Sequence, residues 1–223
     1  MADDPLDAYQ GLWKRTLYAE PADGPSAFVD HTSKVYWLQC GPWHADLRIP
    51  ADRPEFSGIT RLDDCSHEQL VWLASQTAFA GRTVVEGRYC TWHRLIDLSP
   101  GMDNDIGEMR FIDGDTLEER HPGGKYREIW KRLEADRTRT AFTLDDHEFP
   151  TLLRVGRHAM AVCSTRRLCR GHRLLDSARS LGLDELRARA SIEISYARLI
   201  ENQWRIQSSS HPWREKTPLA LDN

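Results

Sequence analysis

The sequence has little of what marks secreted, membrane-spanning or zinc-binding chains. Its five cysteines are scattered without a C-x-x-C pair, which indicates reduced thiols and argues against a disulfide framework or a structural zinc site. No apolar run approaches the roughly 20 residues that cross a bilayer. The first ten residues, MADDPLDAYQ, lack the basic and apolar regions of a secretory signal. We therefore expect a cytoplasmic protein with no membrane partner.

Motifs for common cofactors are also missing. The chain contains no P-loop, no G-x-G-x-x-G turn and no G-x-S-x-G nucleophile elbow. The formal net charge is −4 and the isoelectric point is about 6.1, so there is no basic excess of the kind that binds nucleic acid. These absences predict that the chain uses no cofactor and binds no nucleic acid, and they leave a homodimer open.

The chain is nonetheless rich in tryptophan and in short alternating segments. It has eight Trp among 223 residues, and Trp suits cores, cavity walls and interfaces because it combines a large apolar area with one donor. In the segment 43–49, Ala45, Leu47 and Ile49 share one face of an extended chain. The Asp113-Gly114 step between two alternating runs is a strong hairpin signal. Such patterns predict a mainly β protein with strands near residues 11–19, 34–40, 43–49, 82–98, 106–112, 116–120, 191–200 and 204–210. Residues 125–133 are either a strand or a helix, and their short length and flanking glycines favour a strand. Residues 151–167 are either one long strand or a hairpin.

Helical signals are few. Ser66 and Gln69 have the spacing of a capping box, which predicts a covering helix over residues 67–80 that stops at Gly81. Helix-forming residues predict short helices near 174–188. The charged segment 134–148 indicates a boundary between a barrel domain, residues 1–135, and a second, smaller β-rich half, residues 136–223, packed on the first. The final residues are expected to pack through Trp213 and then fray.

The first strand opens on Gly11-Leu12-Trp13, which is similar to the G-x-W element that opens lipocalin and fatty-acid-binding barrels. The order VYWLQ, DLRIP, DIGEMRF and YREIW, within residues 11–132, also resembles a little-characterised family of paired lipocalin-like barrels. This resemblance to the lipocalin-like (calycin) superfamily implies antiparallel barrels around a cavity, built as two pseudo-repeated halves. It implies no particular reaction, because such barrels host many functions. The C-terminal half departs most from the pattern.

Polar residues in the middle of the predicted strands are the candidate ligand contacts. A small barrel holds one small molecule among apolar walls and a few polar groups. Asp46 and Arg48 share one strand face, where they form either a charge pair that can receive a ligand carboxylate or an ordinary surface pair. Trp37 and Trp92 are expected to shape the cavity walls. Further ligand-binding candidates are Arg94, Asp97, Tyr126 and Glu128.

His93 is the preferred proton carrier, since imidazole titrates near neutral pH. Strand alternation sends His93 and Arg94 to opposite faces, so the two side chains cannot line one cavity. A purely structural histidine is the alternative. The catalytic set predicted from the sequence is His93 together with Asp46 and Arg48.

Three functions follow from these residues. The first is binding of a small, partly apolar organic molecule in a barrel cavity, with cofactor-free acid–base catalysis of isomerase, cyclase or lyase type. The second is a non-catalytic protein-interaction module. The third is a non-haem iron oxygenase, because His44-x-Asp46 places two metal ligands on one strand face, with His93, His147 or His158 as the third ligand. Under the first two hypotheses we expect no metal.

Overall fold

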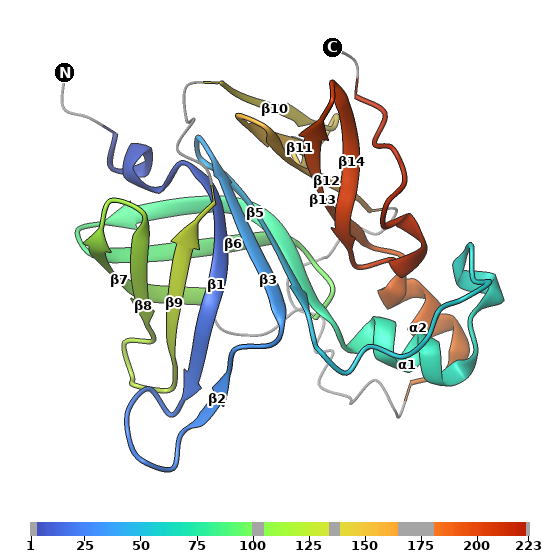
Figure 1. Ribbon diagram of the computed structural model, residues 1–223, viewed down its shortest axis with the longest axis horizontal. Coiled ribbons are helices and arrows are strands. Elements are labelled where there is room, and N and C mark those ends of the chain that lie inside the picture. Colours follow the sequence, from blue (N-terminus) through green and yellow to red (C-terminus); the bar gives the residue numbers. More distant parts are fainter. Residues whose placement is uncertain (1–3, 100–104, 134–138, 165–180, 222–223) are drawn as a thin grey trace.

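The computed structural model describes residues 4–99, 105–133, 139–164 and 181–221, and its first sheet is a closed antiparallel barrel (Figure 1). The strands follow chain order around the barrel, and β1 pairs with both β3 and β9, which closes the ring. A short strand, β2 (Phe28–Asp30), extends the far end of β1. The eight barrel strands are β1 (Gly11–Glu20), β3 (Lys34–Cys40), β4 (Trp43–Ile49), β5 (Thr77–Glu86), β6 (Tyr89–Asp97), β7 (Asp105–Asp113), β8 (Thr116–Arg120) and β9 (Arg127–Arg132).

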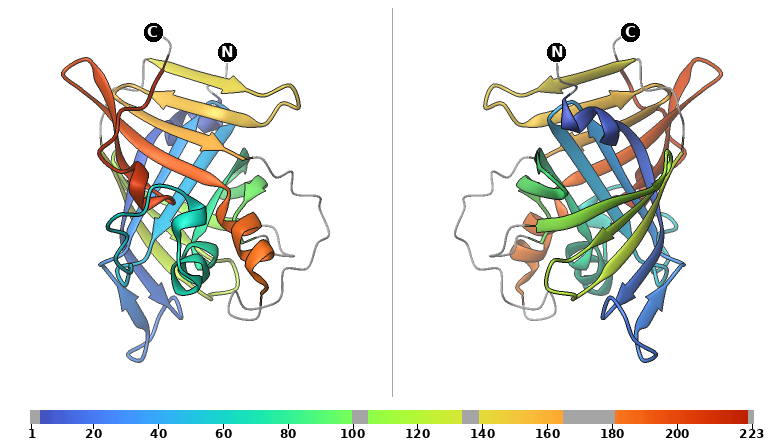
Figure 2. Two further views of the ribbon diagram at one scale, coloured as in Figure 1. Left: turned by 90° about the vertical axis from the view of Figure 1, so that its right-hand side faces the viewer. Right: turned by 90° about the vertical axis from the view of Figure 1, so that its left-hand side faces the viewer.

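A second sheet of five antiparallel strands packs against the outside of β3, β4 and β5 (Figure 2). An apolar core cluster fills the space between the two sheets, with Leu38 and Leu47 from the barrel and Met160 and Ile194 from the second sheet. The five strands are β10 (Thr140–Leu144), β11 (Pro150–Val155), β12 (His158–Cys163), β13 (Glu193–Ile200) and β14 (Gln203–Ser209).

This packing explains why β4 is buried on both faces. Ala45, Leu47 and Ile49 point out of the barrel into the shared apolar core, so the apolar face of the strand is the outer one. The alternate residues, His44, Asp46 and Arg48, therefore point into the barrel. The period-two pattern that predicted the strand also fixes which side chains reach the interior.

Two α-helices pack on each other beside the barrel. The predicted capping box is confirmed, since Ser66 Oγ accepts from Gln69 N and Ser66 N donates to Gln69 Oε1. Helix α1 (His67–Ser75) is shorter than predicted because residues 77–80 pair with β4 as the start of β5. It packs mainly on α2 (Leu183–Ala190). No helix in the described ranges is long and apolar enough to cross a membrane.

Short 3₁₀ helices complete the barrel and the connections. Helix η1 (Pro5–Tyr9) lies at the barrel end where β1 begins, and η2 (Leu62–Asp64) precedes α1. Helix η4 (Pro212–Arg214) follows β14. Beyond η4 the chain does not fray at once, since Leu219 N donates to Trp204 O and the segment runs back along β14.

The second half differs in detail from the sequence prediction. Strand β10 lies inside the charged segment expected to be a boundary. Residues 151–163 form a hairpin around Gly156, which confirms the hairpin alternative for this segment. The predicted helical residues 174–180 lie outside the described ranges. Among the described strands, no pairing closes the second sheet into a barrel. The pseudo-repeat and the division at residue 135 stay predictions.

Candidate functional site

The barrel interior has an apolar half and a charged half. The apolar half lies beneath η1, where Tyr9, Trp13 and Leu117 are buried together. Arg132 crosses this end, with its guanidinium 4.1 Å from the ring centroid of Trp13 and hydrogen bonds to the carbonyls of Ala8 and Gln10. The charged half faces the opposite end, near the start of β3 and β5. That half contains Arg15, Arg48, Arg94, Asp46, Asp97, Asp105, Glu119 and Glu128.

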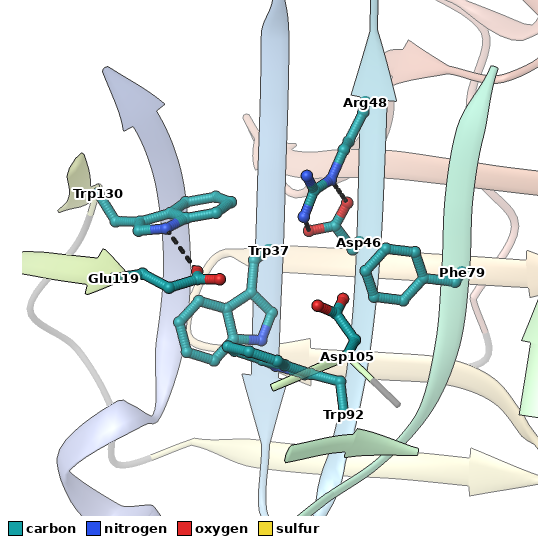
Figure 3. Close-up of a pocket in the computed structure, with 8 residues that line it drawn as sticks. All are labelled: Trp37, Asp46, Arg48, Phe79, Trp92, Asp105, Glu119 and Trp130. Atoms are coloured by element: carbon teal, nitrogen blue, oxygen red, sulfur yellow. Dashed lines mark hydrogen bonds and ion pairs between the residues drawn. The ribbon is translucent and has the colours of Figure 1, made fainter. Parts of the chain in front are cut away.

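A pocket lies between these halves, where aromatic rings meet carboxyl groups (Figure 3). The space left for a small molecule is only about 10 Å³, which is room for about one water. The hollow is therefore much smaller than the cavity expected from the resemblance, because side chains fill it. The lining residues are Trp37, Asp46, Arg48, Phe79, Trp92, Asp105, Glu119 and Trp130.

Asp46 and Arg48 form the ion pair that their shared strand face suggested. Arg48 Nε lies 2.8 Å from Asp46 Oδ1, and Arg48 Nη1 lies 3.4 Å from Glu128 Oε1. The same Glu128 oxygen accepts from Arg15 Nη1 at 2.7 Å, while Glu128 Oε2 is buried with no hydrogen-bond partner among the described residues. Burial raises the pKa of Asp46, and the nearby guanidinium of Arg48 opposes that rise. The Arg48 side chain is 25% exposed, so it stands at the mouth of the charged half.

A β-bulge brings a second charged group into the barrel. The register of β5 and β6 shifts between Ala80 and Gly81, so that Asp97 and Arg94 face the same side despite an odd spacing. A Cβ at Gly81 would lie 2.0 Å from His93 O, so only glycine fits there. Arg94 bonds Asp97 at 3.2 Å and Asp105 at 2.5 Å. Burial disfavours the charged form of Asp105, but the cations around it hold its pKa below the usual value.

Glu119 is a buried carboxyl group without a cation. Its oxygens accept from Tyr126 Oη and from Trp130 Nε1, each at 3.0 Å, and its side chain is almost wholly buried. Burial, with the neighbouring carboxylates Glu128 and Asp105, raises the pKa of Glu119 well above its ordinary value. Burial therefore favours the protonated, neutral form of Glu119. Gly107 leaves room for it, since a Cβ there would lie 2.7 Å from Glu119 Cγ.

Hydrogen bonds identify the tautomer of His44. The indole of Trp37 can only donate, so Gln39 Oε1 is the acceptor in their 3.3 Å contact. Thr83 Oγ1 donates to the same oxygen and must accept from His44 Nδ1 at 3.1 Å. His44 Nε2 then carries a bare lone pair, buried without a hydrogen-bond partner in the part of the chain that the structure describes. Burial, aided by Arg94, lowers the pKa of His44 to about 3, so the ring is neutral.

His93 lies on the other face of β6. It is opposite Arg82, whose guanidinium packs on the outward-facing Trp43, so His93 also points out of the barrel. The structure thus separates His93 from the pocket. His147 and His158 belong to the second sheet, away from His44. Within the described ranges, no three His, Cys, Asp or Glu residues gather as metal ligands.

Apart from His93, the predicted catalytic and ligand-binding residues gather in or beside the charged half. Tyr126 bonds Glu119, and Trp37 and Trp92 line the pocket. Sequence reasoning missed Arg15, Phe79, Asp105 and Glu119. The available signal for Glu119 was its position in the short strand TLEER, on the same face as Leu117.

Known proteins add no further assignment. The chain matches no protein-family model, and comparisons with curated proteins and with solved structures found no match either.

Proposed function

We propose that this chain is a lipocalin-like protein of the calycin superfamily whose barrel binds a small, partly apolar organic cation, such as a primary amine. The placement of Gly11-Leu12-Trp13 at the head of β1 supports the superfamily, together with the barrel of eight antiparallel strands. The chemistry of the barrel interior supports the ligand class.

The observation that carries this proposal is the excess of buried carboxyl groups beside tryptophan rings. Among the described residues of the charged half, five carboxyl groups share three guanidinium groups, one of which also pairs with Asp30, and Glu119 has no cation within ion-pair distance. Apolar side chains of similar volume would usually stabilise a core better than such charges. The faces of Trp37, Trp92 and Trp130 attract a cation, and a carboxylate beside them completes an ammonium site.

The ligand enters by moving side chains at the mouth. Arg48 and Arg94 are each about one-quarter exposed, and both guanidinium groups lie over Phe79, at 5.6 and 3.7 Å from its centroid. Arginine side chains have several rotatable bonds, so outward rotation of Arg48 enlarges the pocket without any change in the strands. The bound ammonium group then contacts Glu119, which loses its proton as its environment becomes cationic.

The proposal extends to acid–base chemistry on the bound molecule. Once ionised by binding, Glu119 is a proton acceptor that can return the proton to another atom of the bound molecule, and the bare Nε2 of His44 is a second acceptor. In this proposal Glu119 takes the role that sequence reasoning gave to His93, while Asp46 and Arg48 orient the ligand. The reaction would be a cofactor-free isomerisation, cyclisation or elimination.

Titration with matched amines and alcohols tests the binding proposal. Propylamine, butylamine and benzylamine are cations at pH 7, whereas propanol, butanol and benzyl alcohol are neutral molecules of nearly the same shape. Tryptophan fluorescence reports binding because three indoles line the pocket. We expect saturable quenching by at least one amine and binding of its alcohol at least about tenfold weaker.

Two variants with the same chemical change provide the control. Glu119→Gln removes the buried carboxyl group, and Glu86→Gln removes an exposed one at the end of β5. Amine affinity should fall at least about tenfold in the first variant and stay unchanged in the second. Equal affinity for amine and alcohol, or full affinity in Glu119→Gln, would refute the proposal.

A further inference from the structure

Arginines on the second sheet differ from those around the barrel in having no acidic partner. Among the described residues before 134, every arginine except Arg82 lies within ion-pair distance of a carboxylate. In the described part of the second sheet and its turns, five arginines have no such pair. They are Arg139, Arg154, Arg157, Arg198 and Arg205.

Two of these unpaired arginines line a concave site. A pocket of about 350 Å³ lies at the end of the second sheet where β13 turns into β14. This volume falls in the range of small-molecule sites. Leu199 and Trp204, which are opposite each other on β13 and β14, supply its apolar part. Its lining residues are Arg139, Arg154, Gly156, Leu199, Asn202 and Trp204.

Backbone contacts hold the pocket in place. Gly156 N donates to Arg139 O at 2.8 Å, which ties the start of β10 to the turn between β11 and β12. Arg157 Nη2 donates to Leu199 O at 2.9 Å, which ties the same turn to the end of β13. Arg154 lies on β11, between the two hydrogen bonds just described. The two guanidinium groups that line the pocket are therefore carried by fixed backbone.

The two halves of the chain also differ in charge, and the half that contains the unpaired arginines is the more basic one. Residues 136–223 contain fifteen Lys and Arg against eleven Asp and Glu, whereas residues 1–135 contain fifteen against twenty-three. The second half therefore attracts anions, while the barrel half attracts cations.

We propose that the pocket lined by Arg139, Arg154 and Trp204 binds a small organic anion, a phosphate or carboxylate carried on an apolar or aromatic group. The planar guanidinium groups donate forked hydrogen bonds to the anion, and Leu199 and Trp204 contact its apolar part. This site is separate from the barrel, and its occupation does not depend on the function proposed there.

Binding of three naphthalene probes tests this site. The probes are 1-naphthyl phosphate, 1-naphthoate and neutral 1-naphthol, and binding is followed by the indole N–H signals in NMR spectra, with Trp204 assigned from Trp204→Phe. We expect saturable binding of the phosphate or the carboxylate with a shift of the Trp204 signal, and 1-naphthol binding at least about tenfold weaker. Which anion binds more tightly identifies the acidic group.

Two double variants that lose the same charge provide the control. Arg139→Gln with Arg154→Gln should weaken anion binding at least about tenfold, whereas Arg198→Gln with Arg205→Gln should change it less than about twofold. The single variant Arg139→Gln, at an exposed position, serves if the double variant unfolds. An equal loss in both double variants would show diffuse attraction and overturn the site. Binding of 1-naphthol as tight as that of the anions would also overturn the site. So would displacement of the bound probe by a ten-nucleotide single strand at a lower concentration than free naphthyl phosphate requires.

Discussion

Glu119 on β8 and Trp130 on the neighbouring strand β9 contact each other diagonally inside the barrel, and the indole Nε1 of Trp130 donates to Glu119 Oε2 at 3.0 Å. An indole N–H and a tyrosine hydroxyl are weak compensation for a buried charge, and no guanidinium reaches this carboxyl group in the described structure. Burial thus favours the neutral form of an acid that lies beside three tryptophans. That arrangement is the centre of the proposed amine site.

The first prediction concerns the pH dependence of stability. The pKa of Glu119 is higher in the folded state than in the unfolded state, so its stabilising effect is full below the unfolded value and is lost as pH rises through the folded value. Glu119→Gln resembles the protonated acid and does not ionise. We expect the variant to match the native protein within about 1 kcal/mol near pH 5 and to become relatively more stable as pH rises. Urea unfolding from pH 5 to 9 measures this difference, and a difference that stays constant would contradict it.

A second prediction concerns the bulge that brings Asp97 beside Arg94. Gly81→Ala places a methyl group against the backbone of His93, so the two strands must separate. We expect a loss of about 3 kcal/mol or more in the free energy of unfolding. Gly114→Ala is the control, because no atom lies within 4 Å of its added Cβ. Similar stabilities for the two variants would show that the close approach at Gly81 is not structurally important.

These two sites show where sequence reasoning succeeds and where it fails. Alternation alone placed Asp46 and Arg48 on one face of their strand, and the structure confirms that shared face. It assigned Asp97 to the face opposite Arg94, because a bulge adds one residue and no local pattern announces it. Asp97 was therefore included among the predicted ligand-binding residues because it is charged, and not because alternation placed it beside Arg94.

Other residues were missed because tertiary pairing overrode a local signal. The helix predicted over residues 67–80 included Phe79, yet Phe79 pairs with Asp46 on β4 and lines the pocket. Glu119 stands in a run of acidic residues that resembles a solvated strand. Only closure of the barrel between β1 and β9 buries it. The second sheet, which covers the apolar outer face of β4, was likewise not visible in the sequence of β4.

A third prediction separates the two histidines. His44 should remain neutral, with its proton on Nδ1, until the pH falls toward 3, because burial lowers its pKa to about 3. Because the pKa of His44 is lower in the folded state than in the unfolded state, its contribution to stability is complete above the unfolded pKa of about 6.5. That contribution is lost as the pH falls below this value. NMR of the ring nitrogens gives the tautomer directly. A protonated ring at pH 5 would contradict the prediction.

Replacing each of the two histidines in turn shows which of them contributes to function. His93→Ala should leave amine affinity unchanged, since its side chain points away from the pocket. His44→Phe keeps the buried volume but removes the bare Nε2, so any turnover that uses this base should stop. A loss of amine binding in His93→Ala would mean that the two faces of β6 have been assigned the wrong way round.

A fourth prediction tests the closed end of the barrel. Arg132 bonds the carbonyls of Ala8 and Gln10 and packs over Trp13, so Arg132→Gln leaves buried acceptors without a donor. We expect a loss of about 3 kcal/mol in stability. Arg110→Gln is the control, because its pair with Glu118 is exposed on the arginine side and should contribute less than about 1 kcal/mol. Thermal unfolding of both variants measures the difference, and an equally small loss in both would contradict the role of Arg132.

The most direct test of the proposed amine site is the number of protons released when an amine binds. Calorimetric titration with the tightest amine, at pH 7 in two buffers of different ionisation enthalpy, gives this number. The account predicts release of about one proton per amine in the native protein, from Glu119, and none in Glu119→Gln. Binding without proton release in the native protein, or the absence of saturable amine binding, would contradict it.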